Sequence, residues 1–237
     1  MIIFWRLLLS HLIADFTLQF DIVNRLKRQC VWGMLLHCMT HFVVSAALTW
    51  PYLSLTWVKI GPFEVSGWWA LAIMLIVHFG VDELRVYSMK GLGYRDGTLS
   101  FLVDQLLHFY VLFMISPILI PAGNTRIAEK WIAIAAMMVL VTDFTTVLIY
   151  FIEKDLFGKE FPRFDEKYFL IFERVVLWAF FFVAGYWWLP FAAAWTFQIF
   201  YVRNRRIIDL SKMNVGLSVV ITIALGVCTR YIYYGSF

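Results

Sequence analysis

Residues 31–50 read VWGMLLHCMTHFVVSAALTW, twenty residues without a single Asp, Glu, Lys or Arg. The hydrocarbon core of a bilayer takes about 20 apolar residues per helix, so this stretch predicts a membrane-spanning helix. It also holds His37 and His41, four residues apart. Ionisable groups are rare inside membrane helices because they are costly there, and they usually mark a functional site. The stretch therefore predicts both a fold class and the place of a polar site.

The composition of the whole chain agrees with this prediction. The 237 residues are 62% hydrophobic and 15% charged, whereas soluble domains are about 45–50% apolar and about 25% charged. A soluble domain of this size could not cover its surface with so few polar groups. The many Phe, Trp and Tyr residues suit aromatic belts at the two membrane interfaces. The composition predicts an integral membrane protein and excludes an ordinary soluble domain.

The apolar stretches predict an all-α, polytopic bundle of about eight spans, or seven if the short seventh segment is re-entrant. The apolar start contains Arg6 and is predicted to be the first span, not a cleavable signal. Pro190 separates the sixth and seventh spans, because proline suits a helix start. We expect a single membrane domain (1–237), with a site-bearing half (1–120) and a supporting helical half (121–237). The predicted spans are 2–20, 31–50, 67–88, 99–120, 131–152, 168–188, 190–203 and 213–234.

The connecting loops alternate in positive charge, which predicts the orientation. The loops 51–66 and 121–130 and the turn near 189 are poor in basic residues. Basic loops face the cytoplasm, so both termini are expected outside. The net charge of +4 then reflects orientation, and no nucleic-acid partner is expected. The basic loops contain Arg25, Lys27, Arg28, Lys90, Arg95, Lys154, Lys159, Arg163, Lys167, Arg203, Arg205, Arg206 and Lys212.

Four segments repeat one spacing of ionisable residues. They are HLIAD (11–15), HCMTH (37–41), HFGVD (78–82) and DQLLH (104–108), and they contain all five histidines of the chain. Residues four apart share one face of a helix. Each of the first four predicted helices therefore carries one such pair on one face.

The alternating direction of the helices places these eight groups at matching depth. With a rise of about 1.5 Å per residue, they fall into two layers roughly 6 Å apart. The layer farther from the cytoplasm holds His11, His41, His78 and His108, and the nearer layer holds Asp15, His37, Asp82 and Asp104.

A metal ion is the simplest common partner for these eight groups. Imidazole and carboxylate together suit Zn²⁺ first, with iron or manganese as alternatives, and helical bundles build di-metal sites from facing side chains. Two ions, or one ion with outer carboxylates that orient the histidines, are both open. The other interpretations are a metal-free proton relay, hydrogen-bonded packing histidines, and bis-histidine haem ligation, which leaves the carboxylates unexplained.

Further polar residues complete the list of candidates. Asp143 could instead simply bond to Thr142 or Thr145, and Glu173 with Arg174 could be an interfacial ion pair. The catalytic candidates are Asp15, Asp82, Asp104, Asp143 and Glu173, since a spare carboxylate can act as a general base. The candidates for substrate binding are Arg85, Arg174, Gln19 and Gln105.

Four motifs carry a resemblance to a known family: HLIADFTLQ (11–19), HCMTH (37–41), HFGVDELR (78–85) and DQLLHF (104–109). At these positions, at the Glu173–Arg174 pair and at the basic cluster 203–206, the sequence resembles an uncharacterised bacterial integral-membrane family of unknown function. The resemblance implies a multi-pass protein of the bacterial inner membrane and brings no activity with it.

A more distant resemblance is to membrane-bound metal-dependent hydrolases, which carry an H-R-x-x-T-H pattern and a separate H-x-x-x-D. His37, Thr40 and His41 match the first pattern, and Cys38 stands where that pattern has arginine. If that arginine binds an anion in those proteins, its replacement leaves the substrate class open.

These observations predict a metal-dependent hydrolase that acts on a lipid-linked or amphiphilic substrate near the cytoplasmic leaflet. The alternatives are a metal or proton transporter, or a non-enzymatic membrane subunit with a structural or redox metal site. Few polar residues lie between the deeper layer and the outside, which argues against transport. The expected partner is a membrane lipid or lipid-linked small molecule, and a homo-oligomer or membrane complex is also open. Three cysteines, Cys30, Cys38 and Cys228, suggest no disulfide framework.

Overall fold

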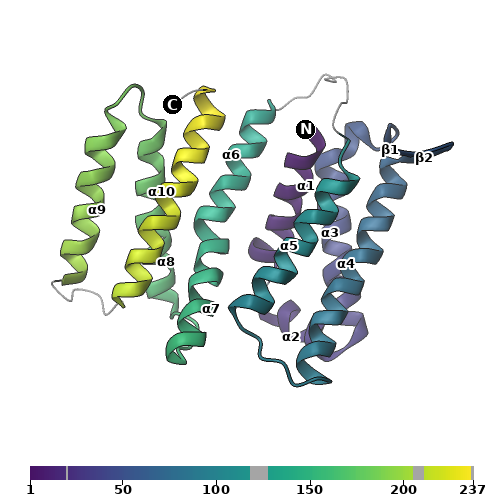
Figure 1. Cartoon of the computed structure of the whole chain (residues 1–237), viewed down its shortest axis with the longest axis horizontal. Coiled ribbons are helices and arrows are strands. Elements are labelled where there is room, and N and C mark those ends of the chain that lie inside the picture. The colour runs from purple at the N-terminus through teal and green to yellow at the C-terminus, as the bar shows by residue number, and fades with distance from the viewer. Residues whose placement is uncertain (20, 118–127, 205–210, 236–237) are drawn as a thin grey trace. The chain divides into compact units, whose positions relative to one another are not determined.

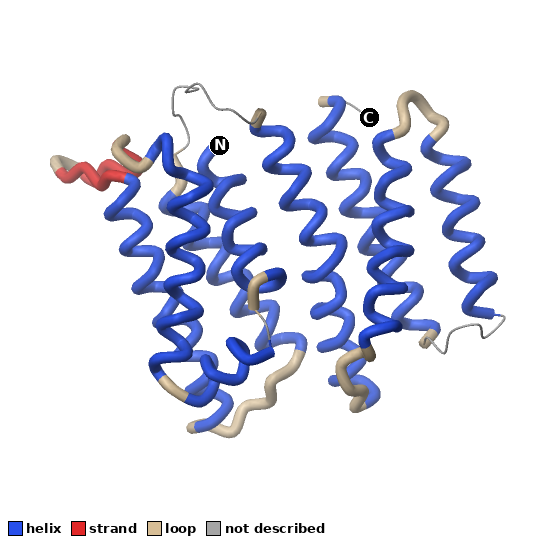
Figure 2. The backbone as a smooth tube through the Cα atoms, turned by 180° about the vertical axis from the view of Figure 1, so that it is seen from behind, coloured by secondary structure: helices blue, strands red, loops and turns tan. Residues whose placement is uncertain are grey.

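The computed structural model describes residues 1–19, 21–117, 128–204 and 211–235 of the chain. The described residues are mostly helical (Figures 1 and 2), which confirms the all-α prediction. They form two compact units, Met1–Ala136 and Met137–Phe237, whose boundary falls inside one helix, α6. Each unit is described by itself.

Four helices form a ring in the first unit. Helix α3 packs against α1 and α4, and α5 packs against α4 and α1, so the four enclose a common core. Consecutive helices of the ring run in opposite directions (Figure 1). The ring helices are α1 (Ile2–Leu12), α3 (Val31–Thr49), α4 (Gly67–Lys90) and α5 (Thr98–Ile115), close to the first four predicted spans.

The segment expected as a loop at 21–30 is a helix, α2 (Asp21–Gln29). Ile22 and Leu26 are four residues apart among basic residues, which is the period of a short amphipathic helix. Gly33 allows the chain to turn back tightly into α3, because a Cβ atom there would lie 2.3 Å from the carbonyl carbon of Leu26. Helix α2 lies across one end of the ring in both views (Figures 1 and 2).

The opposite end of the ring carries a β-hairpin (Figure 1), in a region expected to be loop. After a short 3₁₀ turn, Trp50–Tyr52, strands β1 (Thr56–Ile60) and β2 (Phe63–Ser66) pair in antiparallel register. Gly61 has φ +60 at the turn, a conformation that favours glycine. The buried Trp57 ties the hairpin to the ring by donating its indole N–H to the Tyr52 carbonyl at 2.9 Å.

The core of the first unit is divided between an apolar half and a polar half. The half near the hairpin is filled by buried apolar side chains from all four ring helices and the loop. Arg6 reaches this end and pairs with Glu129 at 2.8 Å. Members of this apolar cluster include Ile3, Leu7, Leu53, Leu71, Met74 and Leu112. The histidines and aspartates of the ring helices gather in the other half, near α2.

The second unit is built on one long helical run. Helix α6 (Glu129–Val139) continues through a π-helical turn, η3 (Leu140–Phe144), into α7 (Thr145–Phe157). Helix α10 (Lys212–Tyr234) packs against α7, α8 (Phe164–Ala179) and α9 (Trp188–Asn204). Arg230 of α10 donates to the carbonyls of Phe181, Val183 and Gly185, which follow α8.

The prediction of eight spans is not confirmed by helix length and composition. Four helical segments of the described chain are long and apolar enough to cross a membrane: 31–52, 98–115, 129–157 and 212–234. A fifth is added if Ile2–Thr17 and Ile22–Gln29, which meet at 94°, form one broken span. Helix α8 has 16 residues and α9 has 17. The predicted span 99–120 ends as a helix at Ile115, and Arg126, Arg205 and Arg206 lie outside the described residues.

Candidate metal centre

All eight predicted ligands converge inside the ring, in the half near α2. The five histidines are buried, with 1–4% of each residue exposed. They come from α1, α3, α4 and α5, so the four faces predicted from the i, i+4 spacing do turn toward one another. Carboxylates from the same elements lie among the imidazole rings, and the side chains of Asp15 and Asp82 are 8% and 5% exposed.

Asp15 connects three of the four helices. It lies in a π-helical turn, η1 (Ile13–Thr17), which continues α1; such turns are frequent at functional sites. Its Oδ1 lies 3.1 Å from Nε2 of His41 and 3.2 Å from Nε2 of His37. Its Oδ2 lies 3.3 Å from Nε2 of His11 and accepts a hydrogen bond from Nε2 of Gln105 at 3.1 Å. The wider turn therefore aims the carboxylate at the centre of the ring.

His37 has more polar neighbours than one imidazole proton can serve. Its Nε2 lies 3.2 Å from Asp15 Oδ1, 3.3 Å from Asp82 Oδ2, 3.4 Å from His78 Nε2 and 3.5 Å from Lys27 Nζ. A neutral imidazole has one N–H and one lone pair. Carboxylate oxygens and imidazole lone pairs that point at one another are stabilised when a cation lies between them.

The nitrogens of His37 and His78 and an oxygen of Asp82 form a triangle with the dimensions of a ligand face. Its edges are 3.4 Å between the nitrogens, 3.3 Å from His37 to Asp82 Oδ2, and 3.6 Å from His78 to the same oxygen. Tetrahedral zinc with bonds of about 2.0–2.1 Å has ligand edges of about 3.3–3.4 Å. Small adjustments of these side chains would place an ion in contact with all three.

Three groups of described residues have ligand atoms close enough to share an ion. The first is Asp15 with His37, His41 and His78. The second is Asp82 with Asp104 and His108, and the third joins the buried Cys38 to His78 and Asp82. Asp82 belongs to the second and third groups and also to the triangle with His37, so its carboxylate is shared by more than one candidate ligand set.

His108 is held in the tautomer that a metal ligand needs. Its Nδ1 lies 2.8 Å from the backbone carbonyl of Asp104, and because a carbonyl only accepts, Nδ1 carries the proton. The lone pair is then on Nε2. Among the described residues, His108 Nε2 and Asp104 Oδ1 are buried without a hydrogen-bond partner. Buried acceptors are normally satisfied, so these two atoms mark a position for a cation or a donor.

The histidine rings form a stack on the side of the carboxylates nearer the hairpin. Ring centroids are 3.9 Å apart for His41 and His78, 4.1 Å for His78 and His108, and 5.1 Å for His11 and His41. The rings border a small cavity whose other walls include Ser45, Met74 and Leu112. The cavity thus changes from polar to apolar toward the hairpin.

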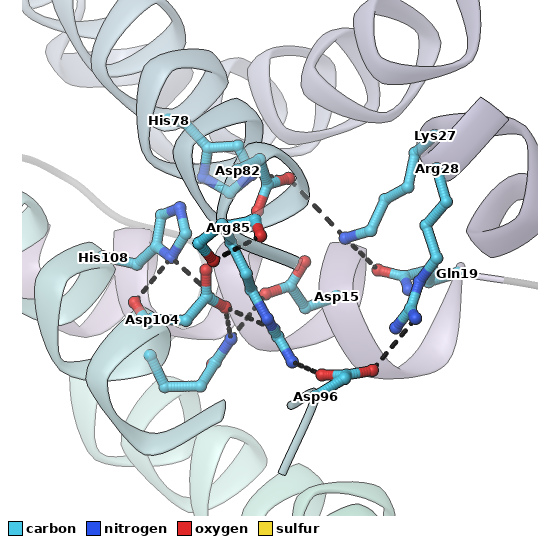
Figure 3. A network of polar contacts seen from close by, with 12 residues as sticks. Asp15, Gln19, Lys27, Arg28, His78, Asp82, Arg85, Asp96, Asp104 and His108 are labelled. Atoms are coloured by element: carbon cyan, nitrogen blue, oxygen red, sulfur yellow. Dashed lines mark hydrogen bonds and ion pairs between the residues drawn. The ribbon is translucent and has the colours of Figure 1, made fainter. Parts of the chain in front are cut away.

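A chain of ion pairs surrounds the centre on the side of α2 (Figure 3). Arg85 donates to Asp104 at 3.0 Å and to Asp96 at 2.9 Å, and Arg28 donates to Asp96 at 3.0 Å. Burial alone raises the pKa of the Asp96 carboxyl, but the guanidinium groups of Arg85 and Arg28 outweigh burial and hold that pKa below its ordinary value. Arg85, expected to bind substrate, is thus placed to fix the position of Asp104.

Lys27 is the main residue that the sequence pattern did not single out. Its ammonium group lies 3.6 Å from Asp82 Oδ2 and donates to Oε1 of Gln19 at 3.3 Å (Figure 3). Gln19 and Gln105, both expected near the site, border the carboxylates: Gln105 also donates to Asp104 at 3.3 Å. Lys27 was interpreted as a charge of a loop, because helix α2 was not predicted. The amphipathic spacing of Ile22 and Leu26 was the signal that could have predicted this helix.

The other three predicted site residues belong to the second unit. Asp143 lies in the π-helical turn η3 and interacts electrostatically with Arg174. The hydroxyls of Thr142 and Thr145, considered as alternative partners of Asp143, donate to backbone carbonyls of their own helices. Glu173 and Arg174 are buried and line a small cavity bordered by α8, α9 and α10.

The fold and the site define a helical protein with several helices apolar enough to span a membrane and a buried histidine–carboxylate centre that could hold a metal ion. The model of one family, described as "Protein of unknown function (DUF3307)", matches residues 3–138. The chain therefore belongs to this family, as the motifs had suggested. No curated protein and no solved structure matches the chain. The matched region coincides with the first unit and includes every residue of the centre.

Proposed function

We propose that the first unit is a membrane-embedded, metal-dependent hydrolase that acts on a lipid-linked or amphiphilic substrate near the cytoplasmic leaflet. The observation that supports this most directly is the triangle of His37 Nε2, His78 Nε2 and Asp82 Oδ2, whose edges of 3.3–3.6 Å suit one ion. Imidazole and carboxylate ligation favours Zn²⁺, and iron or manganese fits the same donors. The second group, Asp82 with Asp104 and His108, could hold a second ion.

Several features support a membrane location beyond the four or five helices that meet the length and composition criteria. Helix α4 has 24 residues, which at about 1.5 Å per residue exceeds the roughly 30 Å of a bilayer core. Large apolar side chains such as Trp32, Trp69 and Ile76 are mostly exposed on the ring, where lipid would cover them. We therefore extend the proposal to the eight-span topology in the bacterial inner membrane, with both termini outside.

The proposed orientation puts the α2 end of the ring at the cytoplasmic interface. Arg25, Lys27 and Arg28 lie on α2, and Lys90 lies at the end of α4 near it. Basic residues concentrate on the cytoplasmic side of membrane proteins. The ionisable side chains are thus in the half of the ring that water and lipid head groups reach.

A divalent ion bound here would supply Lewis acidity, which lowers the pKa of a coordinated water and polarises an ester oxygen. The chain supplies the rest of the chemistry. His37, His78 and Asp82 would hold the ion, Asp15 and His41 are close enough to His37 and His78 to join them as ligands, and Asp15 would also orient His11. With a single ion in that triangle, Asp104 is the best general base, because Arg85 fixes one of its oxygens while Oδ1 has no hydrogen-bond partner among the described residues.

One-sided access favours hydrolysis over transport. Between the histidine stack and the hairpin, most of the core is the apolar cluster that contains Leu7, Leu71 and Leu112, and the buried hydroxyls of Ser10 and Thr49 in this part donate to backbone carbonyls of their own helices. An ion or proton that crossed the unit would need polar groups there to replace its hydration. The alternative that remains is a non-enzymatic subunit whose metal is structural or takes part in redox chemistry.

Metal content of the purified protein tests the proposal. We expect close to one or two ions per chain by mass spectrometry after growth in metal-supplemented medium, and loss of at least one in His41→Ala. Met39→Ala is the matched control, since Met39 lies between His37 and His41 on α3 but is 42% exposed. A wild-type protein that is folded and holds far less than one ion per chain would exclude the metal centre and with it the hydrolase.

A further inference from the structure

The position of Lys27 implies something about the ligand of the metal centre. The Lys27 side chain is 13% exposed, so it lies between the buried ligands and the outside. Its ammonium is 3.5 Å from His37 Nε2 and 3.6 Å from Asp82 Oδ2, two corners of the triangle proposed to hold the ion. Ammonium and ion would therefore be close neighbours and would repel each other. An anion bound between them would be attracted both to the ammonium group and to the ion, and would offset this repulsion.

The balance of charge around the centre points the same way. Four carboxylates, Asp15, Asp82, Asp96 and Asp104, are matched by three basic side chains, Lys27, Arg28 and Arg85, and leave one formal negative charge. One divalent ion makes the group positive by one charge, and two ions make it positive by three. A buried group with net positive charge is stabilised by an anionic ligand.

Among the three basic side chains, Lys27 is placed to contact that ligand. The Arg85 fork is used by Asp96 and Asp104, and Arg28 also pairs with Asp96. The contacts of Lys27 are longer: its Nζ lies 3.3 Å from Gln19 Oε1, 3.5 Å from His37 Nε2 and 3.6 Å from Asp82 Oδ2. A short rotation of the lysine chain would exchange these long contacts for an anionic oxygen. Ammonium groups bind phosphate as point charges, without the planar geometry that arginine requires.

We propose that the group bound at this centre is the phosphoryl group of a phosphate monoester, and that Lys27 binds one of its oxygens. This inference rests on the proposed function and narrows its substrate from an ester of either kind to a phosphate ester. A neutral carboxylic ester would leave the charge of Lys27 beside the ion uncompensated, whereas a phosphate monoester brings up to two negative charges. Hydrolysis forms a bond from the water oxygen to phosphorus and breaks the bond from phosphorus to the ester oxygen. The ester oxygen keeps that electron pair and receives the proton that the water loses, so the products are an alcohol and inorganic phosphate.

The first experiment measures binding, not turnover. The zinc-loaded full chain in detergent is titrated with inorganic phosphate by calorimetry, in parallel with Lys27→Gln and Arg25→Gln. Arg25 is the matched control, because it is an exposed basic residue on the same helix. We expect Lys27→Gln to bind phosphate about tenfold more weakly or worse, Arg25→Gln to bind like the wild type, and Lys27→Arg to recover most of the affinity. Metal content and the unfolding midpoint are measured for each variant.

The outcomes separate this inference from the proposed function. A folded wild-type chain that holds zinc but binds no phosphate, or a Lys27→Gln variant that holds zinc and binds phosphate like the wild type, would overturn the phosphoryl assignment and leave the metal centre standing. Loss of zinc from the wild type would remove the proposed function itself. If Lys27→Gln does not fold, Lys27→Met takes its place in the titration. In addition, the affinities of the wild type for phosphate and for acetate are compared, and equal affinities would contradict the phosphoryl assignment.

A second experiment distinguishes a lipid head group from a free phosphate ester. Release of inorganic phosphate is followed with phosphatidic acid in phosphatidylcholine nanodiscs and with glycerol 3-phosphate in solution. Release from the lipid alone assigns the head group, and release from the soluble ester assigns a free phosphate. A zinc-loaded chain that binds phosphate and releases it from neither contradicts hydrolysis of a phosphate monoester.

Discussion

Nε2 of His37 and Nε2 of His78 lie 3.4 Å apart, although the two histidines come from different helices. Oδ2 of Asp82 lies within 3.6 Å of both nitrogens. Two imidazole nitrogens at this distance either share one proton or face a common cation. The carboxylate oxygen on the same side favours the cation. A cation at the centre of the triangle would contact all three atoms, whereas a proton shared by the two nitrogens would leave the carboxylate oxygen without a partner in the triangle.

Removal of metal should therefore destabilise the first unit. An ion that binds the folded chain and not the unfolded one raises stability by about 2.7 kcal/mol at a hundredfold excess over its dissociation constant. We expect a strong chelator to lower the midpoint of thermal unfolding in detergent, followed by tryptophan fluorescence. His78→Ala should have a lower unfolding midpoint than the wild type, and the chelator should not change it. Met39→Ala should respond to the chelator like the wild type. An identical midpoint for metal-loaded and chelated wild type would contradict the prediction.

Asp82 should control the number of bound ions. Its carboxylate belongs both to the triangle with His37 and His78 and to the group with Asp104 and His108. If two ions bind, Asp104→Asn should lose one and Asp82→Asn should lose both, as measured by mass spectrometry on gel-filtered protein. Glu83→Gln is the control, since Glu83 follows Asp82 in sequence and belongs to none of the described candidate groups. Loss of metal from Asp82→Asn alone would support a single ion in the triangle with His37 and His78, and equal losses in the Asp82 and Asp104 variants would contradict the prediction.

The Asp96 ion pairs should give the fold an acid-sensitive contribution. Arg85 and Arg28 hold the pKa of Asp96 below its ordinary value despite burial. For a carboxyl with a lowered folded-state pKa, the stabilisation is present above the pKa of the unfolded chain and is lost as pH falls through the folded value. The unfolding midpoint of the wild type should therefore fall on acidification below the ordinary range of carboxyl pKa values.

The variant Asp96→Asn isolates this contribution. It should be less stable than the wild type at neutral pH, and its midpoint should change less on acidification. Asp165→Asn, a carboxylate in the first turn of α8 in the other unit, controls for a general effect of losing one negative charge. If the wild type and Asp96→Asn lost stability in parallel as the pH fell, another carboxylate would be responsible.

The convergence of the eight predicted ligands could be derived from the sequence because two regular periods are sufficient. The spacing of four residues puts each pair on one helix face, and the alternating direction of consecutive helices matches the depths of pairs such as His78 with Asp82 and Asp104 with His108. Neither inference requires knowledge of how the side chains pack. The ring of α1, α3, α4 and α5 then brings the faces together.

The features that were not predicted are short elements: the π-helical turn η1, helix α2 and the β-hairpin. Each has nine residues or fewer per element, too few for a sequence period to be recognised with ease. The π-helical turn at Ile13–Thr17 adds a residue to one turn, and no pattern in HLIADFT signals it, yet it aims Asp15 at His37 and His41. Helix α2 is as basic as a cytoplasmic loop, so its role in placing Lys27 was hidden. The hairpin did have a signal: apolar and polar residues alternate in 58–60 and again in 63–66, around a glycine and a proline.

The second unit offers a test that is independent of any metal. Gly226 of α10 faces Phe181, and a Cβ atom at this position would lie 2.4 Å from Cδ2 of that ring, closer than real Cβ contacts allow. The ring of Phe181 is completely buried and cannot swing away, and its backbone carbonyl accepts a hydrogen bond from Arg230 at 3.1 Å. Gly226→Ala should therefore overpack this contact and cost roughly 1–3 kcal/mol.

Gly216→Ala is the matched control on the same helix, because a Cβ there would meet nothing within 4 Å. Removing glycine from an unobstructed helix position stabilises a helix by roughly 0.5–1 kcal/mol, so the two substitutions should have opposite signs. The measured quantity is the free energy of unfolding in a series of detergent mixtures, with each variant compared with the wild type in the same mixture. If both substitutions were stabilising, α10 and the turn after α8 would be farther apart than the contact of Gly226 with Phe181 requires. The hydrogen bond from Trp178 to Thr229 at 2.8 Å, which joins the end of α8 to α10, would then be contradicted as well.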